Sequence, residues 1–284
     1  MKALKPILLT LATLAVAAGL IAGIVVLWSG YQKVPLPIAD RCEATAGGRV
    51  TTIDPEQARN AGIIAGMSIK RGLKPRAASI ALATAYQESG IRNLSYGHAD
   101  SLGLFQQRPS KGWGTEAQIT DPWYATRSFY RAMEHIKHWD TKDINDVAQA
   151  VQRSAYPDAY RKHVDRAKTL SSSLTGETPA SFSCVIAQPA AADPAGMKTY
   201  LSKTYGPTIS IGNTEDGLQV TTTDPRYAWS VAHVAIAAMS DYGLVSVQIG
   251  GYSWTRSTSG LAAWVGSPTQ ATTVALGFSA ATPR

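Results

Sequence analysis

A recurring Asp-Pro pair marks the polar-to-apolar boundaries along this chain. It occurs at Asp54-Pro55, Asp121-Pro122, Asp193-Pro194 and Asp224-Pro225, each time before a stretch with helical spacing of apolar residues. Asp is a favoured N-cap residue and Pro is favoured at the first helical position, so each pair predicts a helix start. These signals and the glycines that follow predict helices over residues 54–71, 75–90, 122–139, 146–155 and 157–170, another from 194, and one over 225–242.

The second part of the chain has a different pattern. β-branched and aromatic residues cluster in five short runs, at 208–212, 218–223, 245–251, 252–256 and 272–278, which is typical of strands. A stretch rich in Ser, Thr, Pro and Ala precedes them and predicts a linker over residues 173–192. We therefore expect a mainly α domain over 46–172 and a small α+β accessory domain over 193–284.

The N-terminal segment is the most hydrophobic part of the sequence. Residues 7–28 contain no charge, and a helix of that length is about 33 Å long, enough to cross a bilayer core of roughly 30 Å. Lys2 and Lys5 favour a cytoplasmic location for residues 1–6. The pattern predicts a single-pass transmembrane anchor with the bulk of the chain extracytoplasmic. A cleaved signal peptide, which would make the protein secreted, remains the alternative.

Composition and charge exclude several classes of protein. With 284 residues, 45% of them hydrophobic, the chain is unlike a disordered tail, a collagen or a coiled coil. Residues 46–172 carry 18 Lys and Arg against 12 Asp and Glu, which is nearly all of the net charge of +7. A basic domain favours polyanionic partners. No nucleic-acid-binding motif is present, so the charge points instead to anionic lipid or an acidic wall polymer.

The two cysteines bracket the basic segment. Cys42 precedes it and Cys184 follows it, and both would be exported with it. Because oxidising compartments favour disulfides, we expect these two residues to pair. Two unrelated thiols are the alternative.

Candidate chemistry concentrates in residues 81–109. A predicted helix ends in Glu88-Ser89, and Gly103-Leu104-Phe105-Gln106 follows, with Pro109 beyond. This arrangement resembles the soluble lytic transglycosylases and goose-type lysozymes, enzymes that cut the glycan strands of peptidoglycan. A third element of that family, Ala-Tyr-Asn-Ala-Gly, is matched only loosely by residues 150–157. The resemblance covers residues 54–170 and implies a lysozyme-like helical domain.

Glu88 is the candidate catalytic acid. Glycosidic cleavage needs a proton donor to the leaving oxygen, so this carboxyl must stay protonated near neutral pH. The negative end of the helix dipole and the apolar residues before it both disfavour the charged form, and both therefore raise its pKa. An exposed Glu at a frayed helix end is the alternative interpretation.

A second carboxylate is harder to find. Asp100 is the one acid between Glu88 and the Gly-Leu-Phe-Gln motif, and an exposed loop Asp is an equally good interpretation of it. Goose-type lysozymes place an acid two residues after that motif, where this chain has Arg108. The resemblance therefore favours a lytic transglycosylase, which works with one glutamate because the substrate's own N-acetyl and 6-hydroxyl groups complete the reaction.

The resemblance also implies roles for the neighbouring residues. Ser89 would bond Glu88 or the sugar acetamide, and Phe105 would form an apolar wall under a sugar ring. Gln106 would donate to sugar oxygens. Gln152 stands near the place of the family Asn, and Tyr156 would line the cleft unless it is a core residue.

Other chemistries have little support in the sequence. His135 and His138 share a helix face, but no acidic or Cys partner accompanies them, so we expect no metal site and no cofactor. Trp113 is either a sugar platform or a loop anchor. The partners expected are peptidoglycan strands, the membrane through residues 7–28, and possible protein contacts of the C-terminal domain. The rival to an enzyme is a non-catalytic wall-binding or scaffold protein with a lysozyme-like fold.

Overall fold

The computed structural model describes residues 19–21, 39–154, 156–267 and 269–278. From Ala39 onward the chain forms one compact unit. The predicted transmembrane segment, residues 7–28, lies outside the described residues except for 19–21. Within the described residues no helix combines the length and hydrophobicity that a membrane crossing requires.

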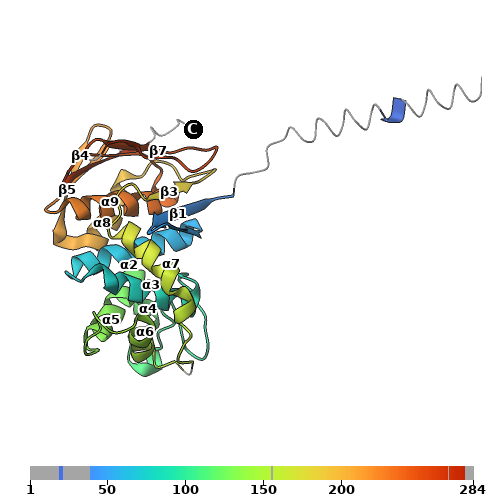
Figure 1. Cartoon of the computed structure of the whole chain (residues 1–284), viewed down its shortest axis with the longest axis vertical. Coiled ribbons are helices and arrows are strands. Elements are labelled where there is room, and N and C mark those ends of the chain that lie inside the picture. Colours follow the sequence, from blue (N-terminus) through green and yellow to red (C-terminus); the bar gives the residue numbers. More distant parts are fainter. Residues whose placement is uncertain (1–18, 22–38, 155, 268, 279–284) are drawn as a thin grey trace, which may run out of the picture. The chain divides into compact units, whose positions relative to one another are not determined.

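The unit begins with the β1–β2 hairpin, continues with a run of helices from α2 to α7, and then combines strands with helices α8 to α10 (Figure 1). Its α-helices are α2 (Pro55–Lys70), α3 (Pro75–Ser89), α4 (Glu116–Ile119), α5 (Pro122–Glu134), α6 (Ile144–Gln152), α7 (Val164–Leu174), α8 (Pro194–Tyr205), α9 (Pro225–Ala237) and α10 (Met239–Tyr242). Its strands are β1 (Arg41–Ala46), β2 (Arg49–Ile53), β3 (Phe182–Val185), β4 (Ile209–Thr214), β5 (Gly217–Thr222), β6 (Leu244–Ile249), β7 (Tyr252–Thr255), β8 (Val265–Gly266) and β9 (Thr273–Phe278). Short 3₁₀ turns cover Pro109–Lys111, Arg161–His163 and Gly206–Thr208.

The smaller sheet is antiparallel, with the order β2-β1-β3. Gly47 and Gly48 connect β1 to β2, and both have positive φ, as a two-residue hairpin turn requires. Cys42 on β1 lies directly opposite Cys184 on β3, and the two form a disulfide across 142 residues of sequence. The predicted pairing is confirmed, and it fastens the start of the unit to the middle of the chain.

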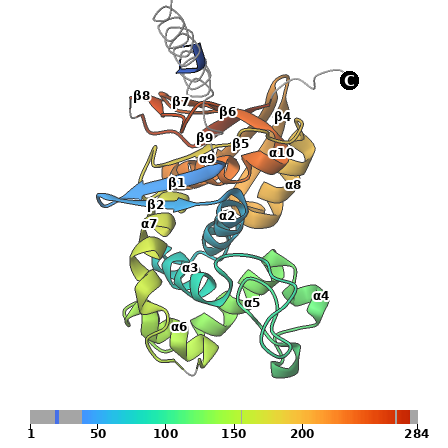
Figure 2. The ribbon, with the colours of Figure 1, turned by 90° about the vertical axis from the view of Figure 1, so that its right-hand side faces the viewer.

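The larger sheet has six strands in the order β4-β5-β9-β6-β7-β8, all paired antiparallel. Helix α9 packs against β5, β6 and β9, and also touches β3 of the smaller sheet. Figure 2 shows α8, α9 and α10 between this sheet and α2. Because α9 is covered on so many sides, every residue from Ala228 to Ala237 is buried.

Helix α2 is the centre of the unit. Every residue from Asn60 to Ile69 is buried, with α3 and α5 against one part of the surface and α8 and α9 against another. Two glycines make the second contact close. A Cβ on Gly62 would lie 2.9 Å from the Tyr200 hydroxyl. A Cβ on Gly66 would lie even closer to the Thr204 methyl group and would overlap with it. The α2 backbone therefore approaches α8 directly, side by side.

The helix starts follow the sequence prediction. Asp54, Asp121, Asp193 and Asp224 each accept a hydrogen bond from a backbone N–H in the first turn of the helix that follows. The helix expected over 157–170 is displaced, because Arg161–His163 form a 3₁₀ turn and α7 runs on to Leu174.

The predicted fold class is wrong in its architecture. We expected a mainly α domain followed by a small α+β domain, whereas the structure is mixed α/β with two antiparallel sheets. The hairpin β1–β2 precedes the first helix, and the segment expected as a linker, residues 173–192, contains β3. Strand β1, the central strand of the small sheet, carries little strand signal because its buried residues are one Cys and two Ala.

Candidate active site

Glu88 occupies the last turn of α3. The helix is buried from Ala77 to Ala85, so its C-terminal end emerges from the core just before Glu88. Gly90 ends the helix with φ of 66°, a left-handed conformation that glycine adopts without strain. The sequence prediction of a helix that ends immediately after the glutamate is confirmed.

Two side chains of α2 hold this helix end in place. Gln57 donates a hydrogen bond of 2.8 Å to the carbonyl oxygen of Gly90, and Asn60 donates one of 2.9 Å to that of Ile91. Carbonyls at a helix C-terminus lack partners within the helix and need such donors when buried. The position of Glu88 therefore depends directly on α2.

The Glu88 carboxyl is half-buried and has two polar neighbours, Tyr160 and Gln152. The hydroxyl of Tyr160 donates a hydrogen bond of 2.7 Å to Glu88 Oε1. Burial raises the pKa of Glu88 above its ordinary value, and the Tyr160 hydroxyl and the Gln152 amide offset only part of this rise. Burial also raises the pKa of Tyr160, and the negative charge of Glu88 adds to that effect, so the phenol remains a donor.

A cleft of about 1080 Å³ opens beside Glu88. Its walls come from the loop after α3, from the end of α5 and from the end of α6, which lie together at one end of the compact unit (Figure 2). Among the described residues that line it, Glu88 is the only acid. The other polar, charged or aromatic lining residues are His98, Ser101, Gln106, Arg108, Lys111, Trp113, His135, Gln152, Arg153 and Ser154.

The Gly-Leu-Phe-Gln motif mainly shapes the loop. Leu102 and Gln107 exchange two backbone hydrogen bonds of 2.9 and 3.0 Å, which close a tight turn around the motif. Gly103 has φ of 74°, and a Cβ there would lie 2.5 Å from the Ile119 carbonyl oxygen. Phe105 is fully buried and stacks on Phe129 with ring centroids 4.5 Å apart, so it belongs to the core and is not among the residues lining the cleft.

Gln106 and Gln152 line the cleft as the sequence suggested. The Gln106 amide donates a hydrogen bond of 3.2 Å to the Tyr96 carbonyl oxygen, and the Gln152 amide donates one of 2.7 Å to the Phe105 carbonyl oxygen. Ser89 instead donates to the Leu104 carbonyl at 2.7 Å and ties the helix end to the motif loop.

Tyr156 is not where the sequence analysis expected it. It is 75% exposed and is not among the residues that line the cleft. Tyr160, four residues later, makes the contact with Glu88. The segment 154–160 contains two tyrosines, and their spacing alone does not show which one faces inward.

Asp100 is held away from Glu88. It pairs with Arg108 at 2.7 Å and accepts hydrogen bonds from the backbone N–H of Ser110 at 2.7 Å and from its hydroxyl at 3.0 Å. These hydrogen bonds hold the pKa of Asp100 well below its usual range. Asp100 lines a neighbouring hollow, not the Glu88 cleft.

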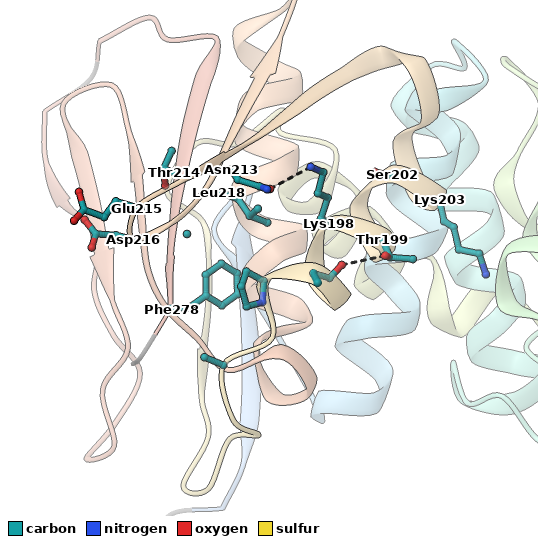
Figure 3. Close-up of a pocket in the computed structure, with 14 residues that line it drawn as sticks. Lys198, Thr199, Ser202, Lys203, Asn213, Thr214, Glu215, Asp216, Leu218 and Phe278 are labelled. Atoms are coloured by element: carbon teal, nitrogen blue, oxygen red, sulfur yellow. Dashed lines mark hydrogen bonds between the residues drawn. The ribbon is translucent and has the colours of Figure 1, made fainter. Parts of the chain in front are cut away.

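A second large hollow lies in the C-terminal half, between α8 and the β4–β5 hairpin (Figure 3). Its volume is about 1060 Å³. Lys198 of α8 donates a hydrogen bond of 3.1 Å to Asn213 across it, and Phe278 lies at its side. Its two acids, Glu215 and Asp216, are exposed on the hairpin turn.

No candidate metal site is found among the described residues, and no family model matches the sequence. Within the described residues no three His, Cys, Asp or Glu side chains lie close enough to hold a metal ion. Comparison of the sequence with protein-family models and with curated proteins gave no match.

Proposed function

We propose that the protein cleaves the glycan strands of peptidoglycan, with Glu88 as general acid and then general base. The observation that carries this proposal is the half-buried Glu88 carboxyl, which has a raised pKa and a hydrogen bond from Tyr160 beside a cleft of about 1080 Å³. A raised pKa keeps the carboxyl protonated nearer to neutral pH, as protonation of a leaving glycosidic oxygen requires.

The chemistry proposed is that of a lytic transglycosylase. A hydrolase of the usual kind needs a second carboxylate, as nucleophile or to activate water. Asp100 is engaged by Arg108 and Ser110, and Glu88 has no acidic partner among the described lining residues. In the proposed route Glu88 protonates the glycosidic oxygen and then accepts the proton of the sugar's 6-hydroxyl. That oxygen closes on C1 and leaves a 1,6-anhydro end.

We further propose that the protein works outside the cytoplasm. The Cys42–Cys184 disulfide supports this, because structural disulfides persist mainly in oxidising compartments. Peptidoglycan strands would be accessible there.

Mass analysis of digested peptidoglycan tests the proposal. The full-length protein is incubated with purified peptidoglycan, and the released fragments are examined for 1,6-anhydro-muramic acid ends. Asp100→Asn is expected to retain cleavage and the same product ends. Reducing-end fragments together with an inactive Asp100→Asn variant would replace the transglycosylase by a hydrolase. Binding of peptidoglycan with no fragments released would favour a non-catalytic wall-binding protein.

A further inference from the structure

The residues that line the Glu88 cleft carry a net positive charge. The described lining contains one acid, Glu88, against three permanent cations, Arg108, Lys111 and Arg153, together with two histidines. Lys111 belongs to the 3₁₀ turn after the motif loop, and Arg153 directly follows α6. The cations therefore come from two separate segments that meet at the cleft.

Two of these cations have no protein counter-ion in the described structure. Arg108 is paired with Asp100. Lys111 and Arg153 form no ion pair with any residue in the described ranges, although both are exposed and line the cleft. Their charges are therefore available to a ligand that enters the cleft.

Glu88 does not use these charges either. A cation within about 4–6 Å of a carboxylate lowers its pKa. The pKa of Glu88 is raised, burial is the main cause, and the opposing contributions come from Tyr160 and Gln152 alone. Neither Lys111 nor Arg153 forms an ion pair with Glu88, and neither is among the groups that lower its pKa.

The backbone at Arg153 gives no reason for arginine there. Its φ is 54°, the left-handed conformation in which helices commonly end and for which Gly or Asn is preferred. Arg153 nevertheless lines the cleft, where its charge is available to a ligand. Guanidinium groups bind carboxylates in a planar, two-bond geometry.

We infer that the cleft selects a glycan bearing carboxylates over a neutral one, with Lys111 and Arg153 as the residues that contact them. The inference rests on the proposed function, since it names the class of strand that reaches Glu88. The carboxylate could belong to the unsubstituted lactyl group of a muramic sugar or to a uronic sugar. Both offer the same charged group within an N-acetylated polymer.

Binding to a full-length Glu88→Gln variant, which cannot turn over, tests the inference by calorimetry. The probes are a muramic-acid-containing oligosaccharide with free lactyl carboxylates, its methyl ester, a hyaluronan oligosaccharide of similar length, and chitohexaose. We expect esterification to weaken binding about tenfold or more, and chitohexaose to bind no better than the ester. Preferential binding of the muramic acid probe assigns the lactyl carboxylate, and preferential binding of hyaluronan assigns the uronate. Equal affinity for the free acid and its ester overturns the inference without the need for any further variant.

Charge variants then locate the contact. In the same background Lys111→Gln combined with Arg153→Asn, which tolerates the left-handed backbone, should remove the preference for the acid over the ester. The matched control is Lys198→Gln, which removes one cation from the other hollow and should leave the preference unchanged. A preference that survives the double variant overturns the assignment to these two residues.

The two proposals fail in different ways. If wild-type protein cleaves no glycan but the acid is still preferred in binding, the proposed catalytic function fails and the selectivity remains. If wild-type protein cleaves neutral and acidic glycans at equal rates, the selectivity fails and the catalytic function remains.

Discussion

The Glu88 cleft and the hollow between α8 and the β4–β5 hairpin are nearly equal in volume, about 1080 and 1060 Å³. They differ in how they hold their acids. Glu88 is half-buried at a helix end and bonded to Tyr160, whereas Glu215 and Asp216 are exposed on a hairpin turn (Figure 3). A cavity's size thus says little about chemistry. The environment of its carboxyl groups is what separates a candidate active site from a surface hollow.

Exchanging one acid in each cavity tests this comparison most strongly. Glu88→Gln keeps the size of the side chain but cannot supply a proton, so glycan cleavage should fall by about a thousandfold or more. Glu215→Gln makes the same change in the other hollow and should leave the rate unaltered. Rates are measured from released fragments, and circular dichroism checks that both variants fold. Full activity of Glu88→Gln would remove this residue from the mechanism.

Removing the disulfide tests how strongly it stabilises the fold that holds both cavities. It closes a loop of 142 residues, and on the chain-entropy model such a bond stabilises the folded state by about 5 kcal/mol. Replacing Cys42 and Cys184 together by Ala should therefore lower the melting temperature strongly. Thermal unfolding of the oxidised, reduced and double-variant proteins provides the measurement. Unchanged melting on reduction would contradict the expectation.

Tyr160→Phe sharpens the comparison by removing the hydrogen bond found only in the Glu88 cleft. Because that bond favours the ionised carboxylate, its loss should raise the pKa of Glu88 further. The alkaline limb of the pH–rate profile should then move to higher pH, with about a tenfold lower kcat/KM from poorer positioning. Tyr156→Phe, at an exposed position, is the control. A lower rate with no movement of the alkaline limb would assign Tyr160 a purely structural role.

The smallest expected effect is on stability. A carboxyl whose pKa is higher in the folded than in the unfolded state binds protons more tightly when folded. Its ionisation therefore destabilises the fold as pH rises above the unfolded value of about 4.3. Glu88→Gln should raise the melting temperature slightly near neutral pH and leave it unchanged near pH 4. Glu215→Gln should show no such pH-dependent gain, and identical melting curves for wild type and Glu88→Gln at every pH would contradict the prediction.

Local signals in the sequence predicted much of the structure. The Asp-Pro pairs gave the four helix starts, because side-chain capping and the fixed φ of proline act within one turn. The position of Glu88 at a helix end followed from Gly90 in the same way. The disulfide was predicted from the positions of two cysteines around one segment.

The parts that depend on long-range packing were not predictable in this way. The small sheet joins β1 to β3 across more than half of the described unit, and only the Gly47–Gly48 pair gave a local sign of its hairpin. Phe105 was expected at the cleft but packs on Phe129, because the motif loop turns it inward. Likewise, Tyr160 contacts Glu88 because it is buried, whereas Tyr156 is exposed, and a short motif does not predict which of two tyrosines is buried.

The close approach of α2 and α8 determines how a truncated fragment of this protein would behave. Helix α2 packs its glycines against Tyr200 and Thr204 of α8. It also holds the end of α3 through hydrogen bonds from Gln57 and Asn60. A fragment ending after α7 would leave this apolar surface of α2 in water, where it would promote self-association. An inactive fragment of that kind would report on the lost support of α2 and carry no information about the chemistry of Glu88.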